Sequence, residues 1–278
     1  MLALLAACAS RTTRVAGPSA LKPALSASKQ QLIERYERQA TAVRSLNAAV
    51  RLMAETGSAF TGVIKEYREI GGFILAEQPR WIRVVGQAPV VGTDIFDMVS
   101  DGETFRMYIP SKNRFLVGPA RLDQAGEKAV ENLRPQPLFD ALLWQKIPPI
   151  QPVVVEEEIE RQPPSRDYVL TVLRPRGAEL EINRRIWFDR SDLRVTRIET
   201  FGPAGRLDSD IRYGDWRQQP GQPAFPWLIV LSRPREDYRL RIEITRLALN
   251  QPLPAQRFRL AQPPGTERVD VGASGGKP

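Results

Sequence analysis

Apolar and polar residues alternate with a period of two along much of this 278-residue chain, and this alternation is the feature that most constrains its fold. Successive side chains of a strand point to opposite faces of a sheet, so the pattern predicts strands with one buried face and one face in water. The plainest case is residues 238–245, where Leu240, Ile242 and Ile244 alternate with Arg239, Arg241, Glu243 and Thr245. Strands are predicted by the same reasoning over 46–54, 60–69, 72–77, 80–86, 95–101, 104–110, 113–118, 153–161, 168–173, 179–188, 195–201, 208–216, 227–232 and 238–249.

Two segments have a helical pattern instead. Ser28 is a candidate cap for a helix that ends near Arg44, because apolar residues recur there at three-to-four spacing. A second, short and very apolar helix is predicted over 137–144, between prolines at 135 and 148. Strands and helices do not alternate and no repeat of fixed period is evident, so hairpin connections within one antiparallel sheet are expected. The predicted class is mainly β (α+β).

A sheet of about 11 strands presents a large apolar face, and two helices are too few to cover it tightly. A curved half-barrel with the N-terminal helix and a short lid helix on its concave face would leave an apolar cavity, and such cavities bind hydrophobic ligands. The candidate ligand-binding residues are Phe96, Met98, Phe105, Met107, Leu240, Ile242 and Ile244 on strands, and Leu138, Phe139 and Leu142 on the short helix, followed by Leu143 and Trp144. The alternative is that these residues pack against one another and that the short helix is an ordinary core helix.

Composition excludes several classes of chemistry. The chain has no histidine and one cysteine, which removes His-based triads, His/Cys zinc sites and any disulfide within the chain. No catalytic residue, metal site or cofactor is predicted, and we expect no enzyme activity. The formal net charge of +8 is dispersed, so no nucleic-acid partner is expected. The best candidates for basic residues that contact lipid headgroups are Arg184-Arg185 and Arg233-Pro234-Arg235. The alternative is that they are scattered surface charge.

The N-terminus carries targeting information. Residues 1–7 are apolar and end at Cys8, and Leu5-Ala6-Ala7-Cys8 resembles the lipobox at which bacterial lipoproteins are acylated on the cysteine. The alternative is a buried N-terminal turn with a chance cysteine. We therefore expect a signal remnant and lipobox over 1–8, lipidation at Cys8 and a flexible tether over 9–27. One folded domain is expected over 28–270, with a disordered tail over 271–278.

Three stretches, 72–83, 89–105 and 108–118, resemble the Lol lipoprotein-carrier superfamily (LolA/LolB-like), and 258–265 is similar to that family's last strand and its Pro-Gly exit. The resemblance implies an unclosed antiparallel half-barrel covered by helices, whose apolar concave face holds acyl chains. The N-terminal helix and the 137–144 segment would then form the lid. This agrees with the cavity inferred from strand alternation alone.

These features predict a lipid-anchored protein of the outer membrane that faces the periplasm of a Gram-negative-type bacterium. It would bind acyl lipid, or the lipid moiety of a lipoprotein, in lipoprotein or lipid transport or in outer-membrane biogenesis. It would meet the membrane through its anchor, with an envelope protein as a possible partner. The alternative is a structural or sensory envelope lipoprotein whose core is filled by its own side chains and which binds a protein partner.

Overall fold

A computed structural model describes residues 23–58, 63–89, 92–121, 134–161 and 164–272. Cys8, the lipobox, most of the expected tether and residues 273–278 lie outside the described residues. Both ends of the described chain are bonded to the sheet: the Leu25 amide donates to the Arg190 carbonyl at 2.7 Å, and the Val271 amide donates to the Val117 carbonyl at 2.8 Å. Within these ranges no helix is long and apolar enough to cross a membrane.

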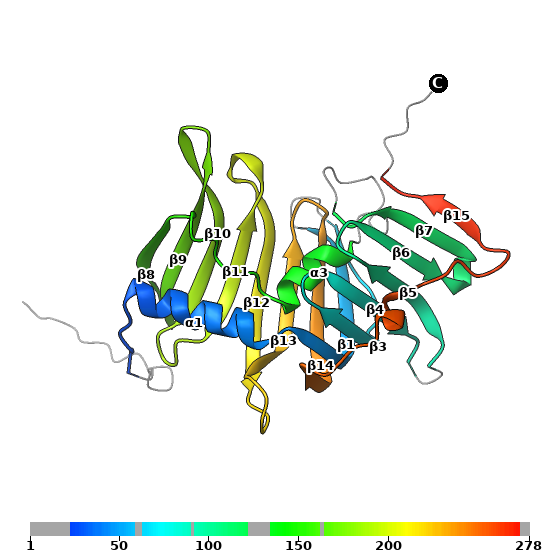
Figure 1. The fold of residues 1–278 in the computed structure, drawn as a ribbon, viewed down its shortest axis with the longest axis horizontal. Helices are drawn as coiled ribbons and strands as arrows, with labels where there is room; N and C mark the ends of the chain where they lie inside the picture. The colour runs from blue at the N-terminus through cyan, green and yellow to red at the C-terminus, as the bar shows by residue number, and fades with distance from the viewer. Residues whose placement is uncertain (1–22, 59–62, 90–91, 122–133, 162–163, 273–278) are drawn as a thin grey trace, which may run out of the picture.

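All of the described strands belong to one curved sheet of 15 strands (Figure 1). Its order is β15-β7-β6-β5-β4-β3-β1-β14-β13-β12-β11-β10-β9-β8, and β2 pairs with β1 outside this path. The strands of the first half are β1 (Ser45–Ser58), β2 (Val63–Glu66), β3 (Ile70–Glu77), β4 (Trp81–Gln87), β5 (Asp94–Ser100), β6 (Thr104–Ile109) and β7 (Arg114–Pro119). The others are β8 (Val153–Arg161), β9 (Pro164–Arg176), β10 (Glu179–Asp189), β11 (Val195–Phe201), β12 (Leu207–Arg217), β13 (Phe225–Arg233), β14 (Tyr238–Leu249) and β15 (Glu267–Asp270).

The predicted mainly-β, open, curved sheet is confirmed, and the expected count of about 11 strands is wrong. The sheet is larger because every one of the fourteen alternating segments contributes a strand, with β2 inside the predicted 60–69, and the short β15 adds a fifteenth. β15 also departs from the all-antiparallel expectation, since it pairs parallel to β7.

The predicted last strand over 258–265 is also wrong. Ala255–Phe258 forms a short 3-10 helix, and the strand comes only at Glu267–Asp270. Pro263 and Pro264 carry no amide hydrogen to donate to a ladder, and Gly265 has a φ of 74°, in the left-handed region that favours glycine. The chain therefore turns at Pro-Pro-Gly before it pairs with β7.

Both predicted helices are present on one side of the sheet (Figure 1). α1 spans Lys29–Ala42, and its Ser28 cap forms a capping box with Gln31. α1 crosses several strands, because Lys29 donates to the Val153 carbonyl of β8 and Gln39 donates to the Ala224 carbonyl just before β13. α3 spans Pro135–Leu142, starting two residues earlier than expected, and lies over β4, β5 and β13. Proline at its first position suits a helix start, where the missing N–H is not needed.

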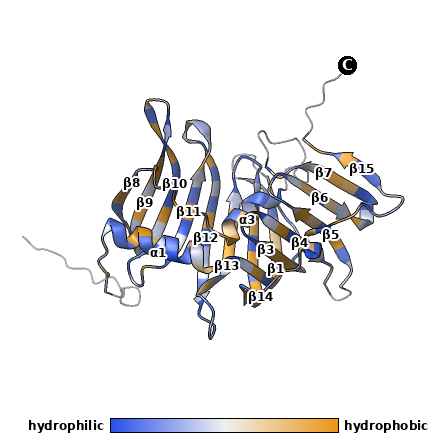
Figure 2. Ribbon diagram, viewed as in Figure 1, coloured by the Kyte–Doolittle hydropathy of each residue, from blue (hydrophilic) through white to orange (hydrophobic). Residues whose placement is uncertain are grey.

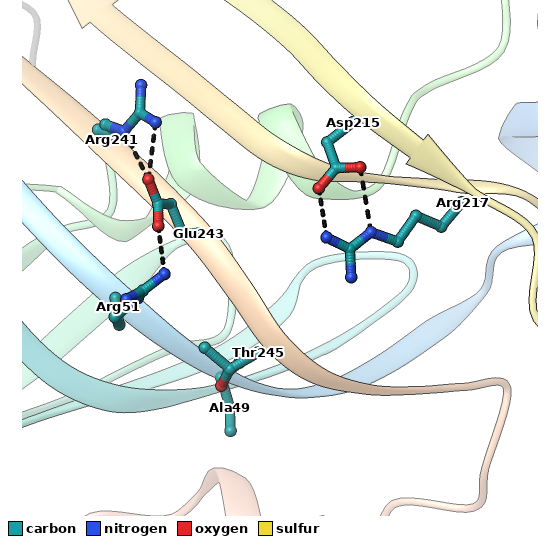
Figure 3. Close-up of polar contacts among 7 residues, drawn as sticks. All are labelled: Ala49, Arg51, Asp215, Arg217, Arg241, Glu243 and Thr245. Atoms are coloured by element: carbon teal, nitrogen blue, oxygen red, sulfur yellow. Dashed lines mark hydrogen bonds and ion pairs between the residues drawn. The ribbon is translucent and has the colours of Figure 1, made fainter.

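Hydrophobic and hydrophilic residues alternate along the strands, as predicted (Figure 2). On β14, Ile242 is fully buried and pairs with Leu52 of β1 on the helix-covered face. Glu243, the next residue, faces the other way and accepts hydrogen bonds from Arg51 at 2.7 Å and from Arg241 at 2.9 and 2.7 Å (Figure 3). The inner face forms one continuous hydrophobic core with the helices.

Candidate functional site

The ten predicted ligand-binding residues are brought together in the core. Eight are buried in a single hydrophobic cluster, and two are partly buried against it: Phe96 and Leu240. The buried eight are Met98, Phe105, Met107, Leu138, Phe139, Leu142, Ile242 and Ile244. The short helix and the strands beneath it are therefore in direct contact, and none of the ten residues lines the cavity described next.

A cavity of about 590 Å³ opens beside this core. Its walls come from α1, from α3 and the segment after it, and from β9 to β14. Its apolar lining includes Pro137, Trp144, Ile198, Phe201 and Ile211. This volume lies within the range of about 300–1,000 Å³ found for small-molecule sites.

Two rows of side chains cross the sheet at the floor of the cavity. The registers of β10, β11 and β12 align Ile186, Ile198 and Ile211 in one row, of which Ile198 and Ile211 line the cavity. Two residues further along each strand, on the same face, they align Arg184, Thr200 and Ser209. Arg233 of β13 extends the second row, because its Nη1 donates to the Ser209 hydroxyl at 2.8 Å. The floor of the cavity thus changes from apolar to polar over two residues along each strand.

Two β-bulges shape the polar end. The pairing of β10 with β9 skips Asn183, and the pairing of β12 with β11 skips Asp208. In each case the extra residue lines the cavity together with the residue that follows it, Arg184 or Ser209. In a regular strand neighbouring side chains point to opposite faces, and bulges are a common device for re-aiming side chains next to functional sites.

An aromatic cluster fastens the helices over the sheet. Trp144 stacks on Tyr36 of α1 with ring centroids 5.4 Å apart and meets Tyr213 of β12 edge-on at 5.2 Å. The Trp144 indole donates to the Tyr213 hydroxyl at 3.0 Å, and that hydroxyl donates to the Ala141 carbonyl at 3.0 Å. The Tyr36 hydroxyl donates to the Gln145 carbonyl at 2.8 Å. We call these three aromatic side chains the latch.

Burial controls the ionisation of the latch. It raises the pKa of Tyr36, against an opposing effect of the Arg184 guanidinium, and it raises the pKa of Tyr213 well above the ordinary tyrosine value. Both phenols therefore keep the proton that they donate to the backbone of α3 and of the segment after it throughout the physiological range.

The cavity lining is rich in arginine, with seven arginines against three carboxylates: Arg121, Arg134, Arg174, Arg184, Arg206, Arg233 and Arg235 against Asp140, Asp208 and Glu236. Sequence reasoning singled out Arg184, Arg233 and Arg235 and missed the others. Arg174 lies on β9, whereas Arg121, Arg134 and Arg206 lie outside the strands, and no local pattern in the sequence marks these four as cavity residues.

The fold has counterparts among solved structures. A LolA superfamily protein of Nitrosomonas europaea matches with a TM-score of 0.51 and 13% identity, over 84% of this chain and 99% of the other. A putative outer membrane lipoprotein-sorting protein domain from Vibrio parahaemolyticus gives 0.51 and 11%, over 81% and 95%. The protein has a LolA-like fold. A DUF1329 family protein of Desulfovibrio piger also matches this LolA-like fold, with a TM-score of 0.54 and 13% identity over 82% and 94%. No protein-family model and no curated protein matches the sequence.

Proposed function

We propose that the protein binds the acyl chains of a lipid or lipoprotein in its half-barrel and that it acts by binding, without turnover. We further propose that it is anchored through Cys8 to the outer membrane, faces the periplasm, and serves lipoprotein or lipid transport or outer-membrane biogenesis. The observation that carries the proposal is the cavity of about 590 Å³ between the concave sheet and the latched helices. The LolA-like fold supports it, because two of the matched structures are described as LolA superfamily and lipoprotein-sorting proteins.

Hydrophobic transfer would supply the driving force. Each buried methylene group contributes about 0.8 kcal/mol, so one long acyl chain gains enough to be held without polar specificity. The apolar end of the cavity offers Ile198, Ile211 and Trp144 as contacts. A chain longer than the cavity would have to displace part of α3, because the core beneath α3 is filled by the protein's own side chains.

The filled core also favours the second candidate, a structural or sensory envelope lipoprotein that binds a protein partner. In that case the ten core residues only stabilise the fold. The two candidates differ in whether the cavity takes up lipid.

The test uses the full chain with Cys8→Ser, which removes the acylated thiol so that covalent lipid cannot be mistaken for cargo. Mass spectrometry of an organic extract and uptake of a fluorescent fatty acid are measured. Thr200→Trp fills the cavity from its polar row. Thr171→Trp is the matched control, since Thr171 lies between the buried Leu170 and Val172 on β9 and so faces the other side of the sheet.

We expect about one acyl lipid per chain, or saturable uptake, in Cys8→Ser and in the control, and loss of both in Thr200→Trp. A clean extract with no uptake by Cys8→Ser would refute acyl binding and favour the protein-binding scaffold.

A further inference from the structure

The polar end of the cavity carries more positive charge than its own carboxylates balance. Three arginines of the cavity lining pair with its three carboxylates: Arg233 donates to Glu236 at 3.0 and 2.6 Å, Arg235 lies 3.6 Å from Asp208, and Arg121 donates to Asp140 at 2.7 Å. Arg174 is paired with Glu181, outside the lining, at 3.5 Å. Arg184 and Arg206 are different, since their hydrogen bonds within the described part of the chain go to neutral oxygens. Arg206 donates to the Pro203 carbonyl at 3.2 Å.

Arg184 is placed to receive a ligand. Its Nη1 donates to the Tyr36 hydroxyl at 2.8 Å and to the Gln145 carbonyl at 3.0 Å, so the latch fixes its position. Both bonds leave from one nitrogen, while a guanidinium has five N–H donors in a planar fork that suits phosphate and carboxylate. Because the side chain lines the cavity, its remaining donors are available to a molecule inside it.

Arg206 lies at the rim of the cavity, on the same side as Arg184. It follows the 3-10 turn Pro203–Gly205 between β11 and β12, and Gly202, Pro203 and Arg206 all line the cavity. The turn is held to β10, because the Ala204 amide donates to Glu181 at 3.4 Å. This bond brings the rim arginine near the strand that carries Arg184.

We propose that the cavity selects an amphiphile with an anionic head, of which a phosphate monoester is the model, and that Arg184 and Arg206 bind that head. The chain of the amphiphile lies on the apolar row of Ile198 and Ile211, one step below. This inference rests on the proposed acyl-binding function and names its ligand class. The basis of this inference is that the apolar row and the polar row lie side by side in one cavity, so they match the chain and the anionic head of such a molecule.

The experiment compares two ligands that share a chain and a glycerol: lauroyl lysophosphatidic acid and monolauroyl glycerol. Binding to the full chain with Cys8→Ser is followed by tryptophan fluorescence and calorimetry at low salt, below the concentrations at which the ligands aggregate. Glycerol 3-phosphate serves as the head without the chain. The variants are Arg184→Gln and Arg206→Gln. The matched control is Arg106→Gln, an exposed β6 residue between the buried Phe105 and Met107.

We expect the phosphate ligand to bind about tenfold or more tightly than monolauroyl glycerol, since hydrogen bonds to charged groups are worth about that factor. Each cavity variant should lose about tenfold for the phosphate ligand, and the control should lose nothing. Arg206→Gln keeps the test decisive if Arg184→Gln loosens the latch, because the hydrogen bond of Arg206 within the described residues goes to Pro203, which is not part of the latch.

Equal binding of the two lauroyl ligands would overturn the headgroup inference and leave acyl binding intact. Binding of glycerol 3-phosphate as tight as that of the full ligand would also overturn it, in favour of a site for small anions. If neither lauroyl ligand binds, the proposed function itself fails.

Discussion

The latch predicts a large effect for the loss of one oxygen atom. In Tyr213→Phe the ring and its packing remain, while two hydrogen bonds of 3.0 Å disappear. The partners left behind are the indole N–H of Trp144, whose side chain is buried, and the carbonyl of fully buried Ala141, in the last turn of α3. A carbonyl at a helix end has no partner within the helix, so the Tyr213 hydroxyl acts as its cap.

Each buried polar group deprived of its partner costs about 1–3 kcal/mol. For the pair we expect the free energy of unfolding to fall by about 2–4 kcal/mol, measured by urea denaturation at pH 7. The urea dependence of the unfolding free energy should not change, because the surface buried on folding is the same. Tyr108→Phe is the control: Tyr108 is a half-buried residue of β6 whose hydroxyl bonds to none of the described residues, and we expect a change within about 0.5 kcal/mol. A loss below about 0.5 kcal/mol in Tyr213→Phe would refute the view that these bonds hold the helices to the sheet.

Three further predictions concern pH, like charges and the sheet edge. Burial raises the pKa of Tyr36 and Tyr213 in the folded state. The stability that these phenols contribute is therefore complete below their pKa in the unfolded chain, about 10, and is lost as pH rises toward their pKa in the folded state. Alkaline denaturation followed by circular dichroism should show this loss, and a flat profile between pH 9 and 12 would contradict it. Burial and neighbouring carboxylates on β8 and β10 raise the pKa of Asp167, so its ionised form destabilises the fold at neutral pH. Asp167→Asn should raise the free energy of unfolding by about 0.5–1 kcal/mol at pH 7 and by less at pH 4. Equal gains at the two pH values would argue against this cause. A Cβ at Gly118 would lie 2.3 Å from the Val271 carbonyl oxygen. Gly118→Ala should therefore release β15 from β7 and speed amide hydrogen exchange over 267–271. Unchanged exchange would show that this edge of the sheet can accommodate the methyl group.

The strands and helices were predictable because their signals are local. Residues 238–245 alternate without interruption, and Ser28 with Gln31 supplies a capping box within four residues. The expected count of about 11 was lower than the fourteen alternating segments of the sequence, and β15 was missed because it is only four residues long, too short to show a period of its own.

The cavity was only partly predictable. Alternation identified the inward residues of β5, β6 and β14, and these fill the core, while the cavity lies over β10 to β12. Which inward residues are covered by a helix depends on how α1 and α3 cross the sheet, and no local pattern contains that. The bulges at Asn183 and Asp208 cannot be seen in the sequence either, because a bulge is a mismatch between two strands.

The pairing of β1 with β14 determines the order in which the molecule can assemble. Leu52 lies opposite Ile242, so about two hundred residues must be made before the centre of the sheet can join, and closing so long a loop is entropically costly and slow. On either side of this seam the strands follow one another as hairpins, from β3 to β7 and from β8 to β14, and each series can form by itself. A nascent chain that has not yet released residue 249 therefore exposes a long open edge on β1. Such edges recruit other chains, so a molecule of this topology depends on protection from aggregation until its last long strand is complete.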